Sequence, residues 1–372
     1  MKRRKFINSA GAGMAGILAA GSAPAFAQAS PEIKWRLTSS FPKSLDTIYG
    51  AAEVISKRVA AATNNKFQIQ LFASGEIVPG LQALDAVQNG TVQACHTAPY
   101  YYVGKDPTFA FGTAVPFGMN CRQFNAWWYV GGGDAVYNDF LKEYGVHAFL
   151  SGNTGAQMGG WYRKEIKTVA DLKGLKLRIG GFAGQVLAKL GVVPQQIPGG
   201  EIYPALEKGT IDAAEWVGPY DDEKLGFNKV AKFYYYHGWW EGGPALHTIV
   251  NQKALAELPP TYRAILEAAC HEGNTMMMAR YDAGNPDALK RLVAGGTQLR
   301  PFPRPVMEAC YKAALELYKE TSEKNPKFKK VHDHYMGFME NQVLWFRVSE
   351  GTFDTFMQTG RRSAGGDAPK KG

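Results

Sequence analysis

Cysteine is scarce in this chain, and the spacing of its cysteines excludes a thiolate centre. Only 4 of the 372 residues are Cys, and no two of them form a C-x-x-C pair. Structural zinc sites and dithiol redox centres rely on such pairs, so we expect neither. So few cysteines over this length also exclude a small scaffold held together by disulfides.

Two common hydrolase patterns are missing as well. The sequence contains no G-x-S-x-G, the turn that presents the nucleophilic serine of many hydrolases. His271 and Glu272 form an H-E pair, but no His follows at the H-E-x-x-H spacing of zinc proteases. The 7 histidines are scattered along the chain, so the sequence assigns no nucleophile and no base.

Long apolar runs are also lacking. The stretch Ile7–Ala20 is shorter than the ~20 residues that a membrane-spanning helix needs. It follows the basic run Lys2-Arg-Arg-Lys5 and precedes Ala25-Phe-Ala27, an A-x-A cleavage site, so residues 1–27 read as a cleaved signal peptide. The paired arginines and the mild apolar region favour twin-arginine export, which predicts a periplasmic protein that folds before export. Folding before export favours free, buried thiols, whereas the oxidising periplasm would allow one or two disulfides.

The excess of positive charge does not indicate a nucleic-acid partner. The formal net charge is +9, from 42 Lys and Arg against 33 Asp and Glu. Removal of residues 1–27 takes away four basic residues and no acid, which leaves 38 − 33 = +5. Arg361, Arg362, Lys370 and Lys371 lie in a Gly- and Ala-rich tail that we expect to be disordered. The folded part is therefore close to neutral, and no nucleic acid is predicted as a partner.

The hydrophobic pattern of the first third predicts an α/β lobe. Residues 35–41 read as a strand, residues 44–63 carry an apolar stripe at helical spacing, and residues 67–71 alternate between apolar and Gln side chains. A helix over 81–88 and a short strand after it complete a β-α-β-α-β order, typical of a mainly parallel sheet. Ligands of such sheets bind beyond the carboxyl ends of the strands.

A later segment repeats the end of this pattern. Residues 86–97 read Ala-Val-Gln-Asn-Gly-Thr-Val-Gln-Ala-Cys-His-Thr, and residues 205–216 read Ala-Leu-Glu-Lys-Gly-Thr-Ile-Asp-Ala-Ala-Glu-Trp. Both contain a helix end, a Gly-Thr turn and a strand, which predicts two lobes of similar build. The pattern predicts a strand over 245–251, a helix over 262–280 and long helix beyond Pro305. The chain is therefore predicted to cross between the lobes more than once and to form a hinge.

Three segments carry a resemblance to a known family. They are Leu172-Lys-Gly-Leu-Lys-Leu-Arg178, Leu190-Gly-Val-Val-Pro194 and Glu201-Ile-Tyr-Pro-Ala-Leu-Glu-Lys-Gly-Thr-Ile-Asp-Ala-Ala-Glu-Trp216. They resemble the signature of DctP-type solute receptors, the periplasmic binding proteins of tripartite ATP-independent (TRAP) transporters. Glu215-Trp216 and the cluster Trp239-Trp240-Glu241 resemble the branch that binds 2-oxo acids (alpha-keto acids) such as pyruvate.

The resemblance implies an α/β, two-lobe, hinged periplasmic binding protein fold (type II-like), with a long interlobe helix and a C-terminal helical extension. We expect lobe I to comprise residues 33–152 and 243–285. Lobe II is expected to comprise residues 153–242 and 286–345 with a long C-terminal helix, followed by a C-terminal segment, 346–372, that ends in the disordered tail. The branch also implies a homodimer through the C-terminal helices.

Arg178 is the residue on which the predicted ligand site depends. It ends an apolar strand that contains Leu175 and Leu177, where an unpaired charge would be costly to bury. Its guanidinium needs an anion, and a carboxylate accepts two parallel hydrogen bonds from such a fork. The alternative is an ion pair with an Asp or Glu of its own lobe.

A metal cation is predicted beside Arg178. In the resembling branch, the positions of Glu215, Trp216, Glu241 and Gln157 hold a cation that also contacts the substrate carboxylate. Arg178, the two glutamates and a monocarboxylate sum to +1 − 1 − 1 − 1 = −2, which a dry cleft does not tolerate without a counter-ion. Sodium is the expected ion and calcium the alternative, since both take hard oxygen ligands.

Three further residues are predicted to contact the ligand. Tyr100 and Tyr101 follow the first-lobe strand, where a hydroxyl can donate to the ligand carboxylate while the ring closes the pocket. Asn153, in a Gly-flanked turn shortly before Gln157, is expected to donate to a keto oxygen. The alternative for both tyrosines is packing between the lobes.

The expected function is therefore a TRAP solute receptor and not an enzyme. It would bind a small 2-oxo monocarboxylate of the pyruvate or 2-oxobutyrate type and deliver it to the permease subunits in the membrane. Lactate or another carboxylate is the alternative ligand. A dicarboxylate is disfavoured, because the candidate set holds one cationic clamp. The competing class is a periplasmic enzyme acting on small organic acids.

Overall fold

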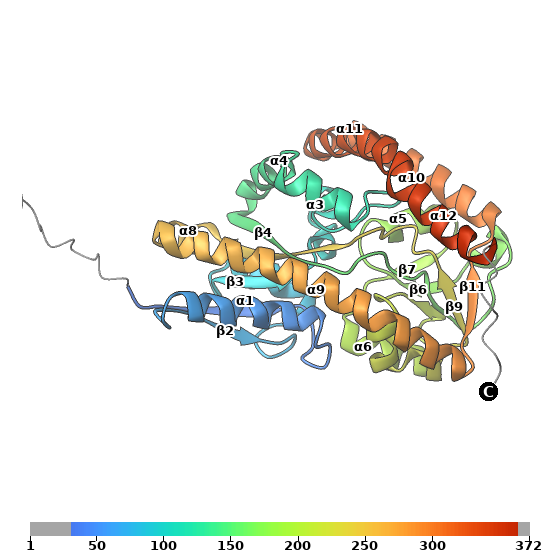
Figure 1. Cartoon of the computed structure of the whole chain (residues 1–372), viewed down its shortest axis with the longest axis horizontal. Coiled ribbons are helices and arrows are strands. Elements are labelled where there is room, and N and C mark those ends of the chain that lie inside the picture. Colours follow the sequence, from blue (N-terminus) through green and yellow to red (C-terminus); the bar gives the residue numbers. More distant parts are fainter. Residues whose placement is uncertain (1–30, 364–372) are drawn as a thin grey trace, which may run out of the picture. The chain divides into compact units, whose positions relative to one another are not determined.

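The computed structural model of this chain describes residues 31–363. The signal peptide predicted over residues 1–27 and the last residues of the basic tail lie outside the described residues. From Lys34 onward the chain forms one unit built on two mixed β-sheets, with helices packed around them (Figure 1). The predicted two-lobe α/β architecture is thereby confirmed.

The first sheet contains five strands. They are β1 (Ile33–Ser39), β2 (Phe67–Phe72), β3 (Ala94–Thr97), β4 (Val146–Asn153) and β10 (Ala245–Asn251). Their order is β2-β1-β3-β10-β4, with β1 parallel to β3 and β10 antiparallel to both of its neighbours. The predicted alternation in β2 is confirmed, since Phe67 and Ile69 are buried and Gln68 is exposed.

The second sheet contains six short strands. They are β5 (Gly160–Tyr162), β6 (Lys176–Arg178), β7 (Val193–Gln195), β8 (Ala213–Ala214), β9 (Phe233–Tyr236) and β11 (Gln298–Pro301). Their order is β11-β9-β5-β8-β6-β7, and β6 runs parallel to both β7 and β8. Because β10 belongs to the first sheet and β11 to the second, the chain crosses between the sheets more than once, as predicted.

Short helices flank both sheets. They are α1 (Ile48–Ala62), α2 (Ala83–Gln88), α3 (Cys121–Tyr129), α4 (Gly133–Leu141), α5 (Ala183–Lys189), α6 (Gly199–Glu207) and α7 (Pro219–Leu225). The sequence echo corresponds to the junctions α2–β3 and α6–β8. Gly90 and Gly209 occupy equivalent places in them, with φ of 73° and 72°, where a side chain would strain the backbone.

The helix α9 (Pro260–Ala294) passes both sheets. It follows the short helix α8 (Gln252–Ala256) and is 35 residues long, whereas the sequence suggested a helix over 262–280. One part of α9 lies beside α1 and β4 (Figure 1), and another part packs on α7. The helix continues through Pro286 because this region is held against α7, where the Asn285 side chain accepts a hydrogen bond from the Tyr220 backbone N–H (3.0 Å).

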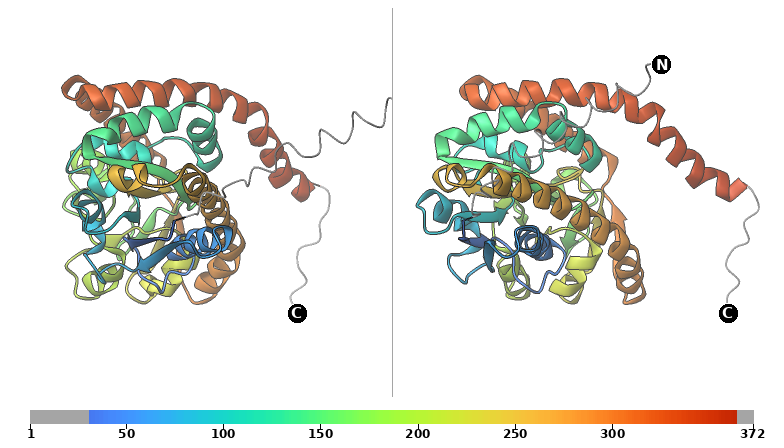
Figure 2. Two further views of the ribbon diagram at one scale, coloured as in Figure 1. Left: turned by 90° about the vertical axis from the view of Figure 1, so that its left-hand side faces the viewer. Right: turned by 60° about the vertical axis from the view of Figure 1, so that its left-hand side comes forward.

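Three helices complete the chain, α10 (Arg304–Lys324), α11 (Pro326–Val348) and α12 (Glu350–Ser363). Asn325 separates the first two, and its side chain accepts from the backbone N–H groups of Lys327 and Phe328. Both views in Figure 2 show α11 continuing into α12. The helix α12 includes Arg361 and Arg362, so the expectation that these two residues lie in a disordered tail is wrong, because the helix of the preceding residues continues through them.

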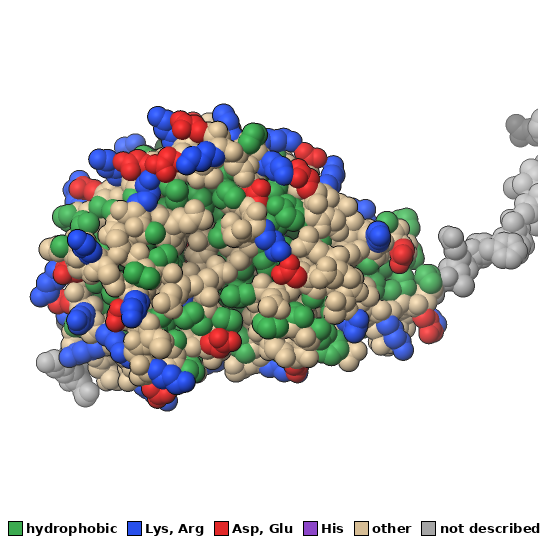
Figure 3. Space-filling view, turned by 180° about the vertical axis from the view of Figure 1, so that it is seen from behind, with side chains coloured by type: hydrophobic (Ala, Val, Ile, Leu, Met, Phe, Trp, Pro, Cys, Tyr) green, Lys and Arg blue, Asp and Glu red, His purple; other side chains and the backbone are tan. Residues whose placement is uncertain are grey.

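The surface and the cysteines agree with a neutral, globular protein. All four cysteines are free, as predicted, and three of them are buried. Lys and Arg side chains are interspersed with Asp and Glu on the face shown in Figure 3. Among the described residues, no helix is both long and apolar enough to cross a bilayer.

Candidate functional site

The candidate site lies where strand ends of the two sheets meet. The turn after β3, from the first sheet, faces the residues that follow β6 and β8 of the second. Between them is a cavity of about 10 Å³, room for about one water molecule. The cavity is lined by Phe41, Ile48, Ala98, Tyr100, Tyr101, Thr113, Thr154, Gln157, Trp216, Val217, Pro244 and Leu246. The structure is therefore closed around the site.

Arg178 ends β6 as predicted and is 1% exposed. Its Nη1 donates to the Glu215 backbone oxygen (2.8 Å) and also to the Glu215 carboxylate, and its Nε donates to the Ile197 carbonyl (3.1 Å). The sequence analysis gave an ion pair between Arg178 and an acid of its own lobe as the alternative to a ligand carboxylate, and this ion pair, with Glu215, is present. Nη2 has no hydrogen-bond partner among the described residues. One arm of the guanidinium is therefore free to donate to another acceptor.

Trp216 and Gly180 complete the surroundings of this ion pair. The guanidinium carbon of Arg178 lies 5.0 Å from the centre of the Trp216 ring, within the range of a cation–π contact. The Gly180 backbone N–H donates to Glu215 Oε1 (2.9 Å). One oxygen of the Glu215 carboxylate thus receives both a guanidinium and a backbone donor, which fixes its orientation.

Two carboxylates lie buried beside one another here. Glu215 is 0% exposed and Glu241 is 1% exposed. Burial raises the pKa of Glu215, against the opposing charge of Arg178. Burial, together with the neighbouring charge of Glu215, raises the pKa of Glu241 well above its usual range. Glu215 Oε2 and Glu241 Oε1 have no hydrogen-bond donor in the part of the chain that the structure describes.

Gln157 brings its amide to the same point. One end of this amide lies 2.6 Å from Glu241 Oε2 and 2.5 Å from the Trp216 carbonyl oxygen, and the other end lies 3.1 Å from Thr154 Oγ1. With nitrogen at the first end, the amide donates to both oxygens. With oxygen there, three oxygens converge, which a cation among them, or a proton on Glu241, would stabilise. The residues present therefore fit a cation with hard oxygen ligands.

The cation ligands predicted from the sequence thus lie together, although they are far apart along the chain. No group of three or more His, Cys, Asp or Glu side chains suited to a metal ion occurs among residues 31–363. The candidate site has only two acids, and an amide and a backbone carbonyl complete it. Such a mixed set suits sodium or calcium, which accept neutral oxygen ligands.

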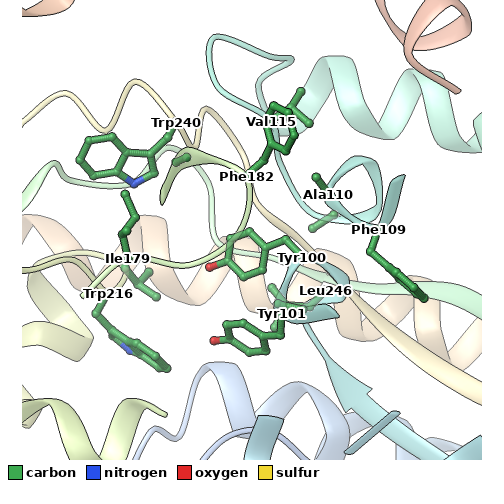
Figure 4. Packing of buried hydrophobic residues seen from close by; sticks show 14 of the residues in the cluster. Tyr100, Tyr101, Phe109, Ala110, Val115, Ile179, Phe182, Trp216, Trp240 and Leu246 are labelled. Atoms are coloured by element: carbon green, nitrogen blue, oxygen red, sulfur yellow. The ribbon is translucent and has the colours of Figure 1, made fainter. Parts of the chain in front are cut away.

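Tyr100 and Tyr101 stand on the opposite wall, in a 3₁₀ turn after β3. Figure 4 shows both hydroxyls pointing toward the side where Trp216 lies. Burial raises the pKa of Tyr101 to about 12 and that of Tyr100 well above its usual value, so both hydroxyls remain protonated donors. The Tyr101 backbone oxygen accepts from Gln196 Nε2 (2.8 Å), which joins the first sheet's turn to the segment after β7.

Asn153 is buried at the end of β4, and its side chain is hydrogen-bonded to backbone groups. Its Nδ2 donates to the Gly243 carbonyl (3.0 Å), and its Oδ1 accepts from the Gly155 N–H (2.9 Å). Like Arg178, Glu215 and Glu241, Asn153 lies beside the cavity's lining residues and not among them. The amide therefore holds the turn that leads to Gln157, and these two hydrogen bonds use only one of its two N–H donors.

Several residues of the site were not identified from the sequence. Gly180 and Gly181 follow β6, and Gly181 has a φ of 66°. Their lack of side chains leaves room for the Tyr100 ring, which a Cβ atom at either position would approach to 2.9 Å or less. The site also includes Thr154 and Phe41, which line the cavity, and the Ile197 carbonyl, which accepts a hydrogen bond from Arg178. Two adjacent glycines at the end of a strand could have indicated this close contact from the sequence. Nothing in the sequence marks Thr154, Phe41 or Ile197 as part of the site.

Comparison with known proteins agrees with this geometry. The profile of the DctP family, described as bacterial extracellular solute-binding protein, family 7, matches residues 38–325. The chain belongs to this family. The predicted resemblance is thereby confirmed, and the family's location is extracytoplasmic.

Three relatives of this solute-binding protein are informative. A monocarboxylate 2-oxoacid-binding periplasmic protein from a Nostoc species is 53% identical over 326 residues, 88% of this chain and 89% of that protein. A TRAP transporter solute-binding protein from Bordetella bronchiseptica is 53% identical, with a TM-score of 0.89 over 90% of this chain and 100% of that chain. That crystal structure is a dimer, with calcium and picolinate in one active site and the other site empty.

The third relative contains sodium. This TRAP solute-binding protein from Pseudoalteromonas atlantica is 39% identical, with a TM-score of 0.84 over 87% of this chain and 98% of that chain, and its crystal structure contains sodium and pyruvate. Relatives of this solute-binding protein therefore contain either sodium or calcium, together with a small carboxylate. Both cations expected from the sequence occur among them.

Proposed function

We propose that this solute-binding protein is the periplasmic receptor of a TRAP transporter for a small 2-oxo monocarboxylate of the pyruvate or 2-oxobutyrate type. The observation that carries the proposal is the unpaired, buried Nη2 of Arg178 beside two carboxylates that each keep one oxygen without a donor. A free cationic donor calls for an anion, and free oxygens call for a cation. A carboxylate bridged to a metal ion satisfies both.

The cation would be held by Gln157 Oε1, Glu215 Oε2, the Trp216 carbonyl and Glu241. Arg178 and the two glutamates sum to −1 before a ligand arrives, and to −2 with a monocarboxylate. Sodium reduces this charge to −1 and calcium to 0, so either ion lowers the cost of burying the ligand. When bound, the cation supplies electrostatic attraction for the carboxylate and the adjacent oxo oxygen.

The ligand carboxylate would accept from Arg178 Nη2 and from the hydroxyls of Tyr100 and Tyr101. Asn153 would act indirectly, because its amide shapes the turn before Gln157. The opposite part of the cavity is apolar, with Phe41 and Leu246 among its lining residues. That wall offers no second cationic clamp, which favours a monocarboxylate over a dicarboxylate.

Two hinged lobes would open and close this site. We assign residues 33–152 and 243–285 to lobe I and residues 153–242 and 286–345 to lobe II. A cavity of about 10 Å³ is too small for a molecule such as pyruvate, so entry requires the walls to separate. Contacts across the cleft include Lys224 with Asp46 and the Tyr220 hydroxyl with Asp46 Oδ2 (3.2 Å).

A second copy of the chain is the proposed partner of the C-terminal helices. Apolar side chains on α11 and α12 are more than half exposed, which is costly for a surface in water. They are Val343, Leu344, Trp345, Val348, Phe353 and Phe356. The Bordetella bronchiseptica relative forms a dimer, which supports a homodimer here. The other expected partners are the TRAP permease subunits in the membrane. The protein would reach the periplasm by twin-arginine export.

The receptor would release its ligand unchanged, whereas the competing class, an enzyme acting on small organic acids, would consume it. The decisive experiment is titration of the purified protein with pyruvate, lactate and succinate in sodium buffer, in calcium buffer and in chelator with potassium. We expect saturable pyruvate binding only with sodium or calcium, full recovery of pyruvate after incubation, and no binding of succinate.

Native mass spectrometry of the protein as purified would identify a retained carboxylate and metal ion. Binding of pyruvate that is indifferent to both cations would contradict the metal bridge while leaving the receptor role intact. Loss of pyruvate during incubation would favour the enzyme instead. Binding of lactate in preference to pyruvate would select the alternative ligand.

A further inference from the structure

The loop that carries two of the proposed cation ligands, residues 215–218, is held from behind by Asp222. This residue lies in the first turn of α7 and is 1% exposed. Its Oδ1 accepts a hydrogen bond from the Val217 backbone N–H (3.3 Å). Its Oδ2 accepts from Trp161 Nε1 (3.0 Å) and from the Tyr234 hydroxyl (2.7 Å).

The geometry of a peptide group connects Asp222 to the cation site. The Val217 N–H and the Trp216 carbonyl belong to one planar peptide unit, and the only cis peptide among the described residues is at Tyr236–His237. In a trans unit the N–H and the C=O point in opposite directions. An acceptor that fixes the Val217 N–H on one side therefore aims the Trp216 oxygen at the Gln157 amide on the other.

The next peptide unit is fixed as well, because the Val217 carbonyl accepts from the Met158 N–H (3.0 Å). Met158 follows Gln157, so the same contact sets the distance between two of the proposed cation ligands. No Lys or Arg pairs with Asp222 in the part of the chain that the structure describes, so its three donors are all neutral. The buried Asp222 carboxylate thus accepts its hydrogen bonds from the loop 215–218 and from the two aromatic residues, Trp161 and Tyr234.

Trp161 and Tyr234 make the anchor rigid. They stand on the neighbouring strands β5 and β9, their rings stack with centres 4.0 Å apart, and both are fully buried. Two hydrogen-bond donors from the second sheet thus fix the position of the Asp222 carboxylate. The carboxylate in turn fixes the position of the loop 215–218. Asp221, the preceding residue, accepts from the Tyr281 hydroxyl of α9 (2.6 Å), which ties the same helical turn to the long helix.

From this arrangement we infer that Asp222 is a positioning residue for cation and carboxylate binding. It orients the Trp216 carbonyl toward the cation and, through the hydrogen bond to Val217, strengthens the negative end of that peptide dipole. The inference rests on the proposed function, because the orientation has a consequence only where a cation is bound. It assigns to Asp222 a contribution to affinity that is separate from its contribution to folding.

The test compares Asp222→Ala, Asp222→Asn and the control Tyr137→Phe. The control removes a buried hydroxyl that donates to the Phe109 carbonyl (3.1 Å), in a part of the first sheet's surroundings that does not touch the site. Pyruvate affinity is measured by calorimetry over a range of sodium concentrations, and the melting temperature is recorded for each protein.

We expect Asp222→Ala to weaken pyruvate binding at least tenfold and to raise the sodium concentration needed for half-saturation. Asp222→Asn keeps an oxygen for the Val217 N–H, so its affinity should stay within about threefold of the wild type. Tyr137→Phe should lower the melting temperature and leave affinity unchanged. Wild-type affinity in Asp222→Ala, or an equal loss in the Ala and Asn variants, would overturn the inference.

If Asp222→Ala does not fold, the double variant Trp161→Phe/Tyr234→Phe replaces it, because it removes both donors that hold Oδ2. Hydrogen exchange of the peptide containing Val217 should then be faster and the half-saturating sodium concentration higher, and no change in both would refute the anchor. A wild-type protein that binds no carboxylate would instead refute the proposed function. The two failures are therefore distinguishable.

Discussion

The ring of Tyr100 lies directly against the backbone of Gly181. A Cβ atom built at Gly181 would stand 2.4 Å from Tyr100 Cδ2, closer than side chains approach one another. Tyr100 follows β3 of the first sheet and Gly181 follows β6 of the second. This contact therefore joins the two walls of the site, and it exists only because residue 181 has no side chain.

Gly181→Ala should weaken ligand binding by at least tenfold. The methyl group would push the Tyr100 ring away, and the φ of 66° at this position strains any residue with a Cβ. Calorimetry with pyruvate measures the effect. Gly200→Ala is the control, since no atom lies within 4 Å of a Cβ there and the residue is exposed at the start of α6. Equal affinity in both variants would disprove the role of the contact.

Arg178→Lys should lower pyruvate affinity at least tenfold with a modest effect on folding. Lysine keeps the charge beside Glu215 but loses the second arm of the fork, and a hydrogen bond to a charged group contributes roughly 1.5–3 kcal/mol. Arg178→Ala should also destabilise the fold by about 3–5 kcal/mol, because the buried Glu215 loses its partner. Urea unfolding and calorimetry separate the two effects.

Arg304→Ala is the control for these variants. Arg304 is 88% exposed and pairs with Glu308 on the same helix, so its loss should change neither the pyruvate affinity nor the free energy of unfolding. Pyruvate affinity within twofold of the wild type in Arg178→Lys would mean that Nη2 does not contact the ligand.

Two buried histidines should make the fold sensitive to acid. Burial lowers the pKa of His96 and of His247 to about 3, and neither ring nitrogen of His96 has a hydrogen-bond partner among the described residues. The unfolded chain titrates each near ~6.5, so between these values it binds protons that the folded state does not. The free energy of unfolding therefore falls as pH falls from about 6.5 toward 3, by roughly 2 kcal/mol per histidine at pH 5.

The measurement is urea unfolding at pH 7 and pH 5 for the wild type and His96→Phe. The wild type should lose about 2 kcal/mol more than the variant between these pH values. The difference isolates the histidine, because other titrating groups such as Asp222, whose pKa burial raises to about 7, are common to both proteins. An identical pH dependence would show that His96 is accessible to protons in the folded state.

Trp345→Glu/Phe356→Glu should convert a dimer into a monomer. Both side chains are more than half exposed on α11 and α12, and a charge on each would oppose apolar association. Light scattering after gel filtration gives the mass. Val293→Glu is the control, since Val293 is 44% exposed near the end of α9, outside α11 and α12. A wild type that is monomeric at micromolar concentration would remove the predicted homodimer.

The sequence by itself determined the architecture to a large extent. The alternation in β2, the stripe on α1 and the echo between the two helix–Gly–strand junctions follow from periodicity, and the structure confirms them. Periodicity works here because each strand and helix must bury one face, whatever its distant neighbours are. The boundaries of α9 did not follow from it, because contacts with α7 carry that helix through Pro286.

For the site, the sequence predicted which residues stand at the ends of the strands. It did not predict which groups these residues contact. A charge at the end of an apolar strand marks Arg178 from the sequence alone, but its ion pair with Glu215 and its free Nη2 depend on how β6 and β8 are placed side by side. The amide of Asn153 is bound to backbone groups that the sequence does not place near it. Periodicity reports only which way a side chain points, whereas a binding site is made by what stands opposite, and that is decided when distant segments pack together.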